Sequence, residues 1–137
     1  MEQLKAYEKL RFYQDICQIR KDVFKITERF DKRHLRLVSQ MRDAARSAKQ
    51  NIREGYRKGH LGEFIHYIRI SQGSLEELSG DMEDCLHDQL ISKDEFNSFL
   101  ALYKSAMYLS VRYIISMNQP TNKNNWRIPA KPQPNRL

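Results

Sequence analysis

The 137-residue chain predicts an all-α protein, and two observations carry that prediction. Residues 1–119 contain no proline, and all four prolines fall within the last 18 residues. Before residue 119, apolar residues recur at steps of three and four, which is the period of an amphipathic helix. A long stretch so poor in proline and glycine argues against a turn-rich β-sandwich or a disulfide scaffold. We expect an antiparallel up-down-up-down four-helix bundle over residues 1–118, followed by a flexible C-terminal tail.

Four apolar stripes define the expected helices in order. They run over residues 12–30, 37–56, 64–86 and 96–114. Side chains three and four residues apart share one face of a helix, so each stripe predicts one amphipathic helix. Four helices with short connections pack most simply as an up-down-up-down bundle.

The connections between the stripes carry turn and capping signals. Asp31 is placed to cap the second helix, because its carboxylate accepts the free N–H groups of a first turn. Three glycines between residues 55 and 62 permit a chain reversal. Ser92 and Glu95 have the spacing of a capping box at the start of the fourth helix. Residues 119–137 hold all the prolines, the single tryptophan and four basic residues with no acid, which predicts a flexible tail rather than a second domain.

Composition narrows the function classes. Lys and Arg number 24 against 17 Asp and Glu, giving a net charge of +7. No run of eighteen apolar residues occurs and the N-terminus lacks the apolar core of a signal peptide, so we expect no membrane partner. Cys17 and Cys85 are isolated, which favours a reduced, cytoplasmic protein. The four histidines show no metal-ligand spacing with them, so no metal and no cofactor are expected.

The charge is unevenly divided along the chain. Residues 33–58 hold eight basic and two acidic residues, a net +6. Residues 61–87 hold one basic and six acidic residues, a net −5, and residues 119–137 add +4. The second and third helices are therefore expected to carry opposite charge.

A row of cations on the second helix is the main candidate binding site. Its members are spaced by three or four residues and lie on one face: Arg42, Arg46, Lys49, Arg53 and Arg57. Like charges at this spacing repel one another, and nucleic-acid phosphate would relieve the repulsion. Arg36, Lys58 and the tail would assist. Three interpretations stay open: such a face is solvated, or it pairs with the acidic third helix within the chain, or it binds an anionic partner.

Other surface features suggest self-association. Gly73 and Gly80 fall on the polar face of the third helix beside Glu76 and Glu77, where missing Cβ atoms allow another chain to approach closely. On the fourth helix several apolar residues lie off the main stripe, namely Leu102, Leu109 and Tyr113. One helix face cannot bury them all inside a single bundle, so these two surfaces are expected to form an oligomer interface.

Catalytic signals are few. No phosphate loop, nucleophile elbow or paired-carboxylate signature is present. Arg29 and His34 have the Arg-x4-His spacing of helical ribonucleases of the HEPN class, although here the pair falls at the first turn between helices rather than near the start of a late helix. The chain is expected not to be an enzyme, with a HEPN-like ribonuclease as the minor alternative.

A resemblance to a known family is carried by residues 47–56, Ser-Ala-Lys-Gln-Asn-Ile-Arg-Glu-Gly-Tyr. Residues 39–45 and 63–78 on either side also contribute matches. Over roughly residues 8–118 the chain resembles the four-helix bundle proteins encoded by intervening sequences in bacterial large-subunit ribosomal RNA genes, a family that includes accessory variability proteins of diversity-generating retroelements. Asn51, Glu54 and Gly55 match its Asn-Ile-x-Glu-Gly signature, for which a structural role is expected. Lys49 and Arg53 replace a proline and an alanine of the commoner pattern.

The resemblance implies a homopentameric ring. In its retroelement branch it also implies binding of RNA or DNA and of a reverse transcriptase. The expected function is therefore a non-enzymatic, homo-oligomeric nucleic-acid-binding accessory of a reverse transcriptase. The alternative is an oligomeric protein-interaction scaffold without a nucleic-acid role, in which basic and acidic helices of neighbouring subunits meet.

Overall fold

The computed structural model describes residues 5–126, and within them every regular element is helical. Four long helices and three short ones follow one another in this order: η1 (Ala6–Lys9), α1 (Arg11–Thr27), η2 (Lys32–His34), α2 (Leu35–Arg57), α3 (Leu61–His87), α4 (Lys93–Met117) and α5 (Pro120–Asn125). The all-α prediction is confirmed. No helix in this part of the chain is both long enough and apolar enough to cross a bilayer.

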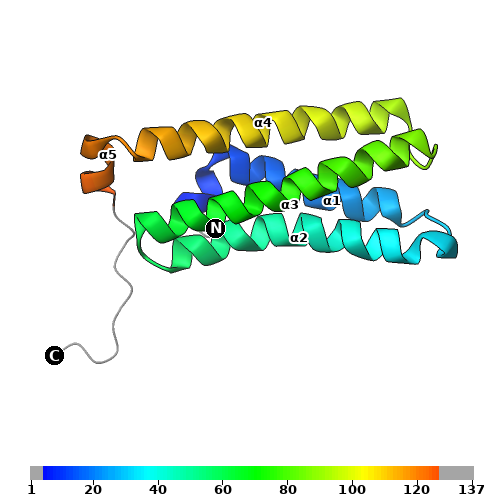
Figure 1. Cartoon of the computed structure of the whole chain (residues 1–137), viewed down its shortest axis with the longest axis horizontal. Helices are drawn as coiled ribbons and strands as arrows, with labels where there is room; N and C mark the ends of the chain where they lie inside the picture. Colours follow the sequence, from blue (N-terminus) through cyan, green and yellow to red (C-terminus); the bar gives the residue numbers. More distant parts are fainter. Residues whose placement is uncertain (1–4, 127–137) are drawn as a thin grey trace, which may run out of the picture.

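The four long helices lie side by side with their long axes roughly aligned (Figure 1). α2 packs between α1 and α3, and α4 packs against both α1 and α3. The chain reverses direction between α2 and α3 and again between α3 and α4. Each long helix thus has two long-helix neighbours, and the apolar stripes meet in a shared core.

The core follows the expected stripes closely in three helices. Its fully buried members include Ile16, Ile19, Met41, Ile52 and Leu75. In α2 the buried positions are mostly small, with Ala44, Ala45 and Ala48 facing the core. Small side chains let α2 and α3 approach closely, and Ser71 of α3 donates a hydrogen bond from Oγ to the Ala48 carbonyl at 2.6 Å.

α4 presents a different face from the one its sequence pattern predicts. Val111 falls on the expected core stripe but is 44 % exposed, while Ala106 and Ser110 are buried. The Ser110 hydroxyl accepts a hydrogen bond from the Gln72 amide of α3 at 2.8 Å, so its burial leaves no unpaired polar group. Because α4 carries apolar side chains on most of its circumference, periodicity alone does not select the face that packs.

The expected caps form, with one shift. Asp31 accepts a hydrogen bond from the Arg33 N–H at 2.9 Å and so caps η2 instead of α2, which begins one turn later. At the α2–α3 turn Gly59 adopts φ +82°, a conformation that favours glycine. At α4 the capping box is confirmed, since Ser92 Oγ accepts from the Glu95 N–H and Glu95 accepts from the Ser92 N–H.

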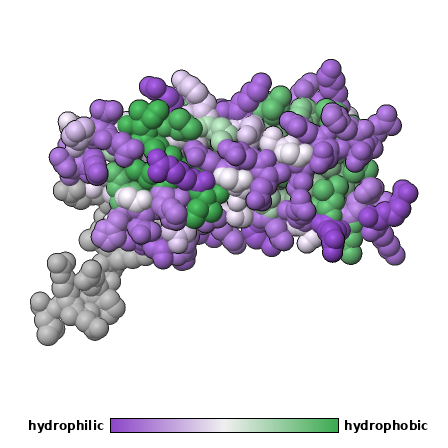
Figure 2. Space-filling model, in the orientation of Figure 1, coloured by the Kyte–Doolittle hydropathy of each residue, from purple (hydrophilic) through white to green (hydrophobic). Residues whose placement is uncertain are grey.

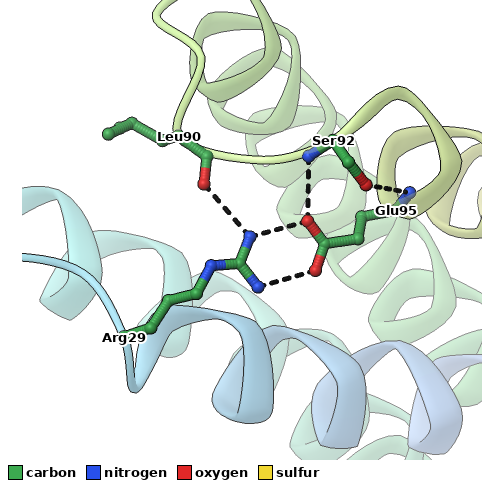
Figure 3. A network of polar contacts seen from close by, with 4 residues as sticks. All are labelled: Arg29, Leu90, Ser92 and Glu95. Atoms are coloured by element: carbon green, nitrogen blue, oxygen red, sulfur yellow. Dashed lines mark hydrogen bonds and ion pairs between the residues drawn. The ribbon is translucent and has the colours of Figure 1, made fainter.

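The same Glu95 side chain ties two helices together. Figure 3 shows the Arg29 guanidinium from the end of α1 lying against the carboxylate of Glu95. Its two terminal nitrogens donate to Glu95 Oε2 and Oε1 at 2.7 and 2.6 Å, and one also donates to the Leu90 carbonyl at 3.1 Å. A two-pronged contact of this kind fixes orientation as well as distance, so it clamps the α1 end to the α4 start.

The predicted tail begins with ordered structure. Pro120 opens α5, where its fixed φ suits a first helical position and no N–H is lost to the helix. Trp126 follows, with its indole N–H 3.2 Å from the Tyr113 hydroxyl and its ring close to Tyr56 and Phe64. The expected boundary at residue 119 thus separates the bundle from a segment that packs against its core. The rest of the predicted tail lies outside the described residues.

Candidate nucleic-acid interface

The five-residue cationic row of α2 lies along the contact between α2 and α1. Its N-terminal member, Arg42, is half-buried there. The Arg42 Nε donates to Thr27 Oγ1 at 2.9 Å, and a terminal nitrogen donates to the Phe24 carbonyl at 3.3 Å. Arg42 therefore joins α2 to the end of α1, a structural task that its position in the row does not reveal.

One aromatic ring gathers cations from both helices. The guanidinium carbons of Arg20, Arg42 and Arg46 lie 4.5, 5.0 and 5.6 Å from the centre of the Phe24 ring. The negative face of the ring attracts each of them, which offsets part of their mutual repulsion. Sequence reasoning missed Arg20 because it treated α2 alone. The neighbouring basic pair at positions 20 and 21 was the available signal.

The C-terminal half of the row lines a groove of about 810 Å³ between η1, α1 and α2. Lys49, Arg53 and Arg57 enter it from α2 and Lys21 enters it from α1. We call the continuous surface along this contact the basic seam, and its members are Arg20, Lys21, Arg42, Arg46, Lys49, Arg53 and Arg57. Sequence reasoning also missed Lys21, which the groove brings opposite the row.

Two other predicted residues lie elsewhere. Arg36 lines a shallow groove between α2 and α3, and Lys58 lies over the Tyr67 ring of α3 at 5.8 Å. Positions 36 and 58 are more than a quarter-turn away from the row, given about 100° per residue. The seven expected nucleic-acid-binding residues therefore do not form one surface: five belong to the basic seam and two to the α3 side of α2.

The ion pairs of α2 stay within that helix. Arg46 lies 3.9 Å from Asp43, while Arg57 and Lys58 lie 3.8 and 3.9 Å from Glu54, all within α2. Across residues 5–126 no ion pair joins α2 to α3. The intramolecular pairing of the basic and acidic helices, left open above, is therefore absent from this part of the chain.

One acid of α3 is drawn inward instead. Asp81 is 8 % exposed, and the Gln40 amide lies 2.9 and 3.0 Å from its two carboxylate oxygens. Burial raises the pKa of Asp81, the Gln40 hydrogen bonds oppose that rise, and the neighbouring charges of Asp84 and Glu77 add to it. The other acids of α3 remain on its exposed side.

The expected oligomer residues fall into two groups. Gly73, Glu76, Glu77 and Gly80 are exposed, and a Cβ on either glycine would meet nothing within 4 Å. By contrast the three expected α4 residues are half-buried and pack against the core: Leu102, Leu109 and Tyr113. Tyr113 lies between Phe12 and Phe64, with ring centres at 5.6 and 5.8 Å. Their own bundle therefore covers much of these three side chains.

Other apolar residues of α3 and α4 are exposed on the surface instead. Tyr108, Val111 and Ile115 of α4 are 65, 44 and 48 % exposed, and Ile70 of α3 is 40 % exposed. We call these four residues the outer apolar patch. Figure 2 shows hydrophobic side chains gathered over the end of the bundle where the second half of α4 lies beside the first half of α3. Several exposed apolar side chains on two neighbouring helices are a feature of interaction sites.

The signature residues near the end of α2 serve helix packing. The Asn51 amide donates to the Ser47 carbonyl at 2.8 Å, and Ser47 Oγ lies 2.9 Å from Ser74 Oγ of α3. A Cβ on Gly55 would overlap the Cβ of Tyr67. Asn51 therefore bonds backbone as expected, and Gly55 allows α3 to approach. Glu54 differs, since its ion-pair partners are side chains rather than backbone.

Two further features bear on possible catalysis, namely the Arg-x4-His pair and possible metal ligands. The Arg29 guanidinium of the Arg-x4-His pair is engaged by Glu95 and the Leu90 carbonyl, whereas the His34 ring packs edge-on to Phe30 with centres 6.3 Å apart. Among the residues that the structure describes, no cluster of three or more His, Cys, Asp or Glu side chains is arranged to hold a metal ion. The basic seam is therefore the best-formed candidate site.

Comparison with known proteins identifies the family of the chain. A search of curated proteins found no match. The family model described as 23S rRNA-intervening sequence protein matches residues 8–110, which span all of α1 to α3 and most of α4. Since that match covers most of the chain, the protein belongs to the 23S rRNA-intervening sequence protein family.

Proposed function

We propose that this protein is a non-enzymatic accessory that binds RNA or DNA through the basic seam. The single observation behind the proposal is the convergence of seven cations from two helices along one helix–helix contact. Lys21 and Lys49 form no ion pair within the described residues. Cations that face neutral groups or solvent attract phosphate, with an affinity that falls as salt rises. No base-reading motif accompanies them, so the binding is expected to be electrostatic.

In this proposal, the protein is an up-down-up-down bundle that acts as a homo-oligomer. The family resemblance implies that this oligomer is a pentameric ring. The family description, with its reference to ribosomal RNA, supports a role beside RNA. We further propose a reverse transcriptase as the partner, on the resemblance to retroelement accessory proteins alone. A reverse-transcriptase gene adjacent to this one would support that partner. A position inside a ribosomal RNA gene would contradict it.

The binding proposal is tested by a filter-binding salt titration with a single-stranded RNA. Wild-type protein is expected to bind at low salt and to lose affinity steeply and linearly on a logarithmic salt scale. Reversing Arg46, Lys49 and Arg53 to Glu removes the centre of the basic seam and is expected to abolish binding, while the helical circular-dichroism signal stays. Binding that is undetectable at low salt would end the proposal.

A charge-matched control separates the effect of the basic seam on binding from the effect of overall net charge. Lys32 and Lys93 are exposed, unpaired in the described part of the chain, and lie at the end of the bundle where Arg29 meets Glu95. A Lys49→Glu/Arg53→Glu variant and a Lys32→Glu/Lys93→Glu variant carry equal net charge. The first is expected to lose binding and the second to retain most of it. Equal losses would mean that only net charge matters.

Self-association through the outer apolar patch is the second part of the proposal. Val111→Asp puts a charge on a member of this patch, and Leu35→Asp puts the same charge on a residue outside it that is 72 % exposed. Val111→Asp is expected to lower the mass seen by light scattering, while Leu35→Asp leaves it unchanged. A wild-type monomer at all concentrations would contradict oligomerisation.

The protein-interaction scaffold remains the alternative function. It is favoured by the acids of α3, which form no ion pair with α2 inside the chain and are thus available to the basic helix of a neighbour. In that case reversing Arg46, Lys49 and Arg53 to Glu breaks the oligomer, and the wild-type protein retains no RNA at any salt concentration. The proposed function predicts instead that the reversed variant stays oligomeric and that the wild-type protein binds RNA at low salt.

A further inference from the structure

The groove between η1, α1 and α2 is more than a continuation of the basic seam. It is a recess of about 810 Å³, within the size range of small-molecule pockets. Its wall holds three tyrosines (Tyr7, Tyr13 and Tyr56) and five cations, which come from α1, from α2 and from the residue before η1 (Lys5, Lys21, Lys49, Arg53 and Arg57). Glu8 is the only acid among the described residues that line it. A recess so rich in positive charge is suited to an anion that can enter it.

The cations of the groove are poorly neutralised by the protein itself. Lys21 and Lys49 have no carboxylate within ion-pair distance in residues 5–126. The Tyr13 hydroxyl, and to a smaller extent the Tyr7 hydroxyl, interact with the Arg53 guanidinium and raise the pKa of Arg53. Glu8 accepts a hydrogen bond from the Lys5 N–H at 3.3 Å. Within residues 5–126, no carboxylate therefore neutralises the positive charge of Lys21, Lys49 and Arg53.

The tyrosines supply a neutral donor beside these charges. Tyr13 is 6 % exposed. Burial, together with the adjacent Cys17, raises the pKa of Tyr13 to about 12, so its hydroxyl keeps its proton at neutral pH. A protonated hydroxyl, two ammonium groups and a guanidinium are all donors. Such a set complements the three terminal oxygens of a phosphate monoester, which carries up to two negative charges.

We propose that this groove receives the terminal phosphate monoester of a nucleic-acid strand, held by Lys21, Lys49, Arg53 and the Tyr13 hydroxyl. The assignment rests on the proposed function, because the basic seam beyond the groove would carry the rest of the strand. An internal phosphodiester has one charge and chain on both sides, whereas a chain end enters a recess from one side. The basic seam leads out of the groove past Arg46 and Arg42.

The test measures fluorescence anisotropy with the full chain and three strands of one sequence, carrying a 5′-phosphate, a 3′-phosphate or hydroxyls at both ends. At least one phosphorylated strand is expected to bind about tenfold more tightly than the hydroxyl strand, the factor typical of one charge-assisted contact. Equal binding of all three strands overturns the groove assignment and leaves the proposed function intact. Binding of none of them overturns both.

Matched variants separate the groove from the general effect of one more phosphate charge. Lys21→Gln removes a cation inside the groove, and Arg20→Gln removes its neighbour on the basic seam outside it. Lys21→Gln is expected to abolish the preference for the phosphorylated strand, whereas Arg20→Gln lowers the affinity for all strands alike and keeps the preference. Tyr13→Phe is expected to reduce the preference for the phosphorylated strand. A preference that survives Lys21→Gln overturns the assignment.

A fourth arm distinguishes a chain end from a free nucleotide, since both carry the same monoester. Adenosine monophosphate is expected to compete with the phosphorylated strand only in large excess, because it lacks contacts along the basic seam. Adenosine monophosphate that binds more tightly than the strand would contradict the chain-end assignment.

Discussion

At the scale of single residues, Gly55 is a position where α2 and α3 approach each other closely. A Cβ there would overlap Tyr67 Cβ and lie 3.4 Å from the Phe64 Cα, so the helices would have to separate. Overpacking of this kind costs about 1–3 kcal/mol, which exceeds the gain of about 1 kcal/mol from replacing a helical glycine. Gly55→Ala is expected to lower the free energy of unfolding by up to about 2 kcal/mol, measured by urea denaturation.

Gly73 provides the matched control in the same fold. It lies inside α3 with nothing within 4 Å of a built Cβ, so no packing cost opposes the better helix former. Gly73→Ala is expected to raise the free energy of unfolding by about 0.5–1 kcal/mol. If Gly55→Ala were equally stabilising, the close approach at Tyr67 would not exist.

The two cysteines differ in their surroundings in a way that thiol chemistry can detect. Cys85 is fully buried, its Sγ lies 3.7 Å from Met41 Sδ, and burial raises the pKa of its thiol to about 11. Cys17 is half-buried and lines the groove. Because the thiolate is the reactive form, one thiol is expected to react rapidly with a disulfide reagent at neutral pH and the other only on unfolding.

A Cys17→Ser variant identifies which thiol is which. It is expected to show no rapid phase in the native state and full reaction in denaturant. Two rapid thiols in the wild-type protein would mean that the core around Met41 opens easily, against the burial described above.

At the scale of elements, the Arg29–Glu95 clamp makes the packing of α1 on α4 sensitive to acid. The pKa of Glu95 is lowered from its usual 4.5 to about 2, chiefly by the Arg29 hydrogen bonds. A depressed carboxyl pKa stabilises the fold above pH 4.5, and that stability is lost as the pH falls towards 2. Glu95→Gln is expected to cost about 1 kcal/mol at pH 7, a modest value because Arg29 is half-exposed.

The difference between wild type and Glu95→Gln is therefore expected to shrink between pH 4.5 and 2, as followed by thermal unfolding. Gln keeps an acceptor for the Ser92 N–H, so the helix cap is preserved. Asp94→Asn in the same helical turn serves as the control, and its effect is expected to be small. A Glu95→Gln effect that does not depend on pH would contradict the clamp.

The individual helices also show how much of the structure could be predicted from the sequence. Stripes on α1 to α3 alternate clearly between apolar and charged positions, so their buried faces follow directly from spacing. α4 has too few charged residues to mark its solvent-exposed face. The exposure of Val111 could therefore not be predicted from the sequence of α4. The basic seam shows a similar limit, because Arg20 and Lys21 join it only through tertiary packing. Spacing also groups Arg42 with its row, although its hydrogen bonds make it a link to α1.

At the scale of the whole molecule, charge and apolar surface are separated onto different sides. The basic seam follows the α1–α2 contact, whereas the outer apolar patch lies on α3 and α4. A bundle that associates through α3 and α4 therefore leaves its basic seam open to nucleic acid. The two parts of the proposed function are compatible because they use different helices.

This separation predicts that oligomerisation strengthens the binding of long strands. The α2 row from Arg42 to Arg57 spans roughly 22 Å at about 1.5 Å per residue, so a strand of a few nucleotides fills one basic seam. A longer strand reaches the basic seams of several copies, and linking binding events raises affinity by about 10²–10⁴-fold without new contacts. Wild-type protein is expected to bind a long RNA much more tightly than a short one in an anisotropy assay.

Val111→Asp is expected to remove this dependence on length without weakening the short strand, because position 111 lies outside the basic seam. Leu35→Asp introduces the same charge on an exposed residue outside the patch and is expected to keep the wild-type ratio of affinities. A Val111→Asp protein that is dissociated by light scattering yet still prefers long RNA would show that one copy holds the whole strand. The outer apolar patch would then have no part in nucleic-acid binding, since the preference would arise within a single bundle.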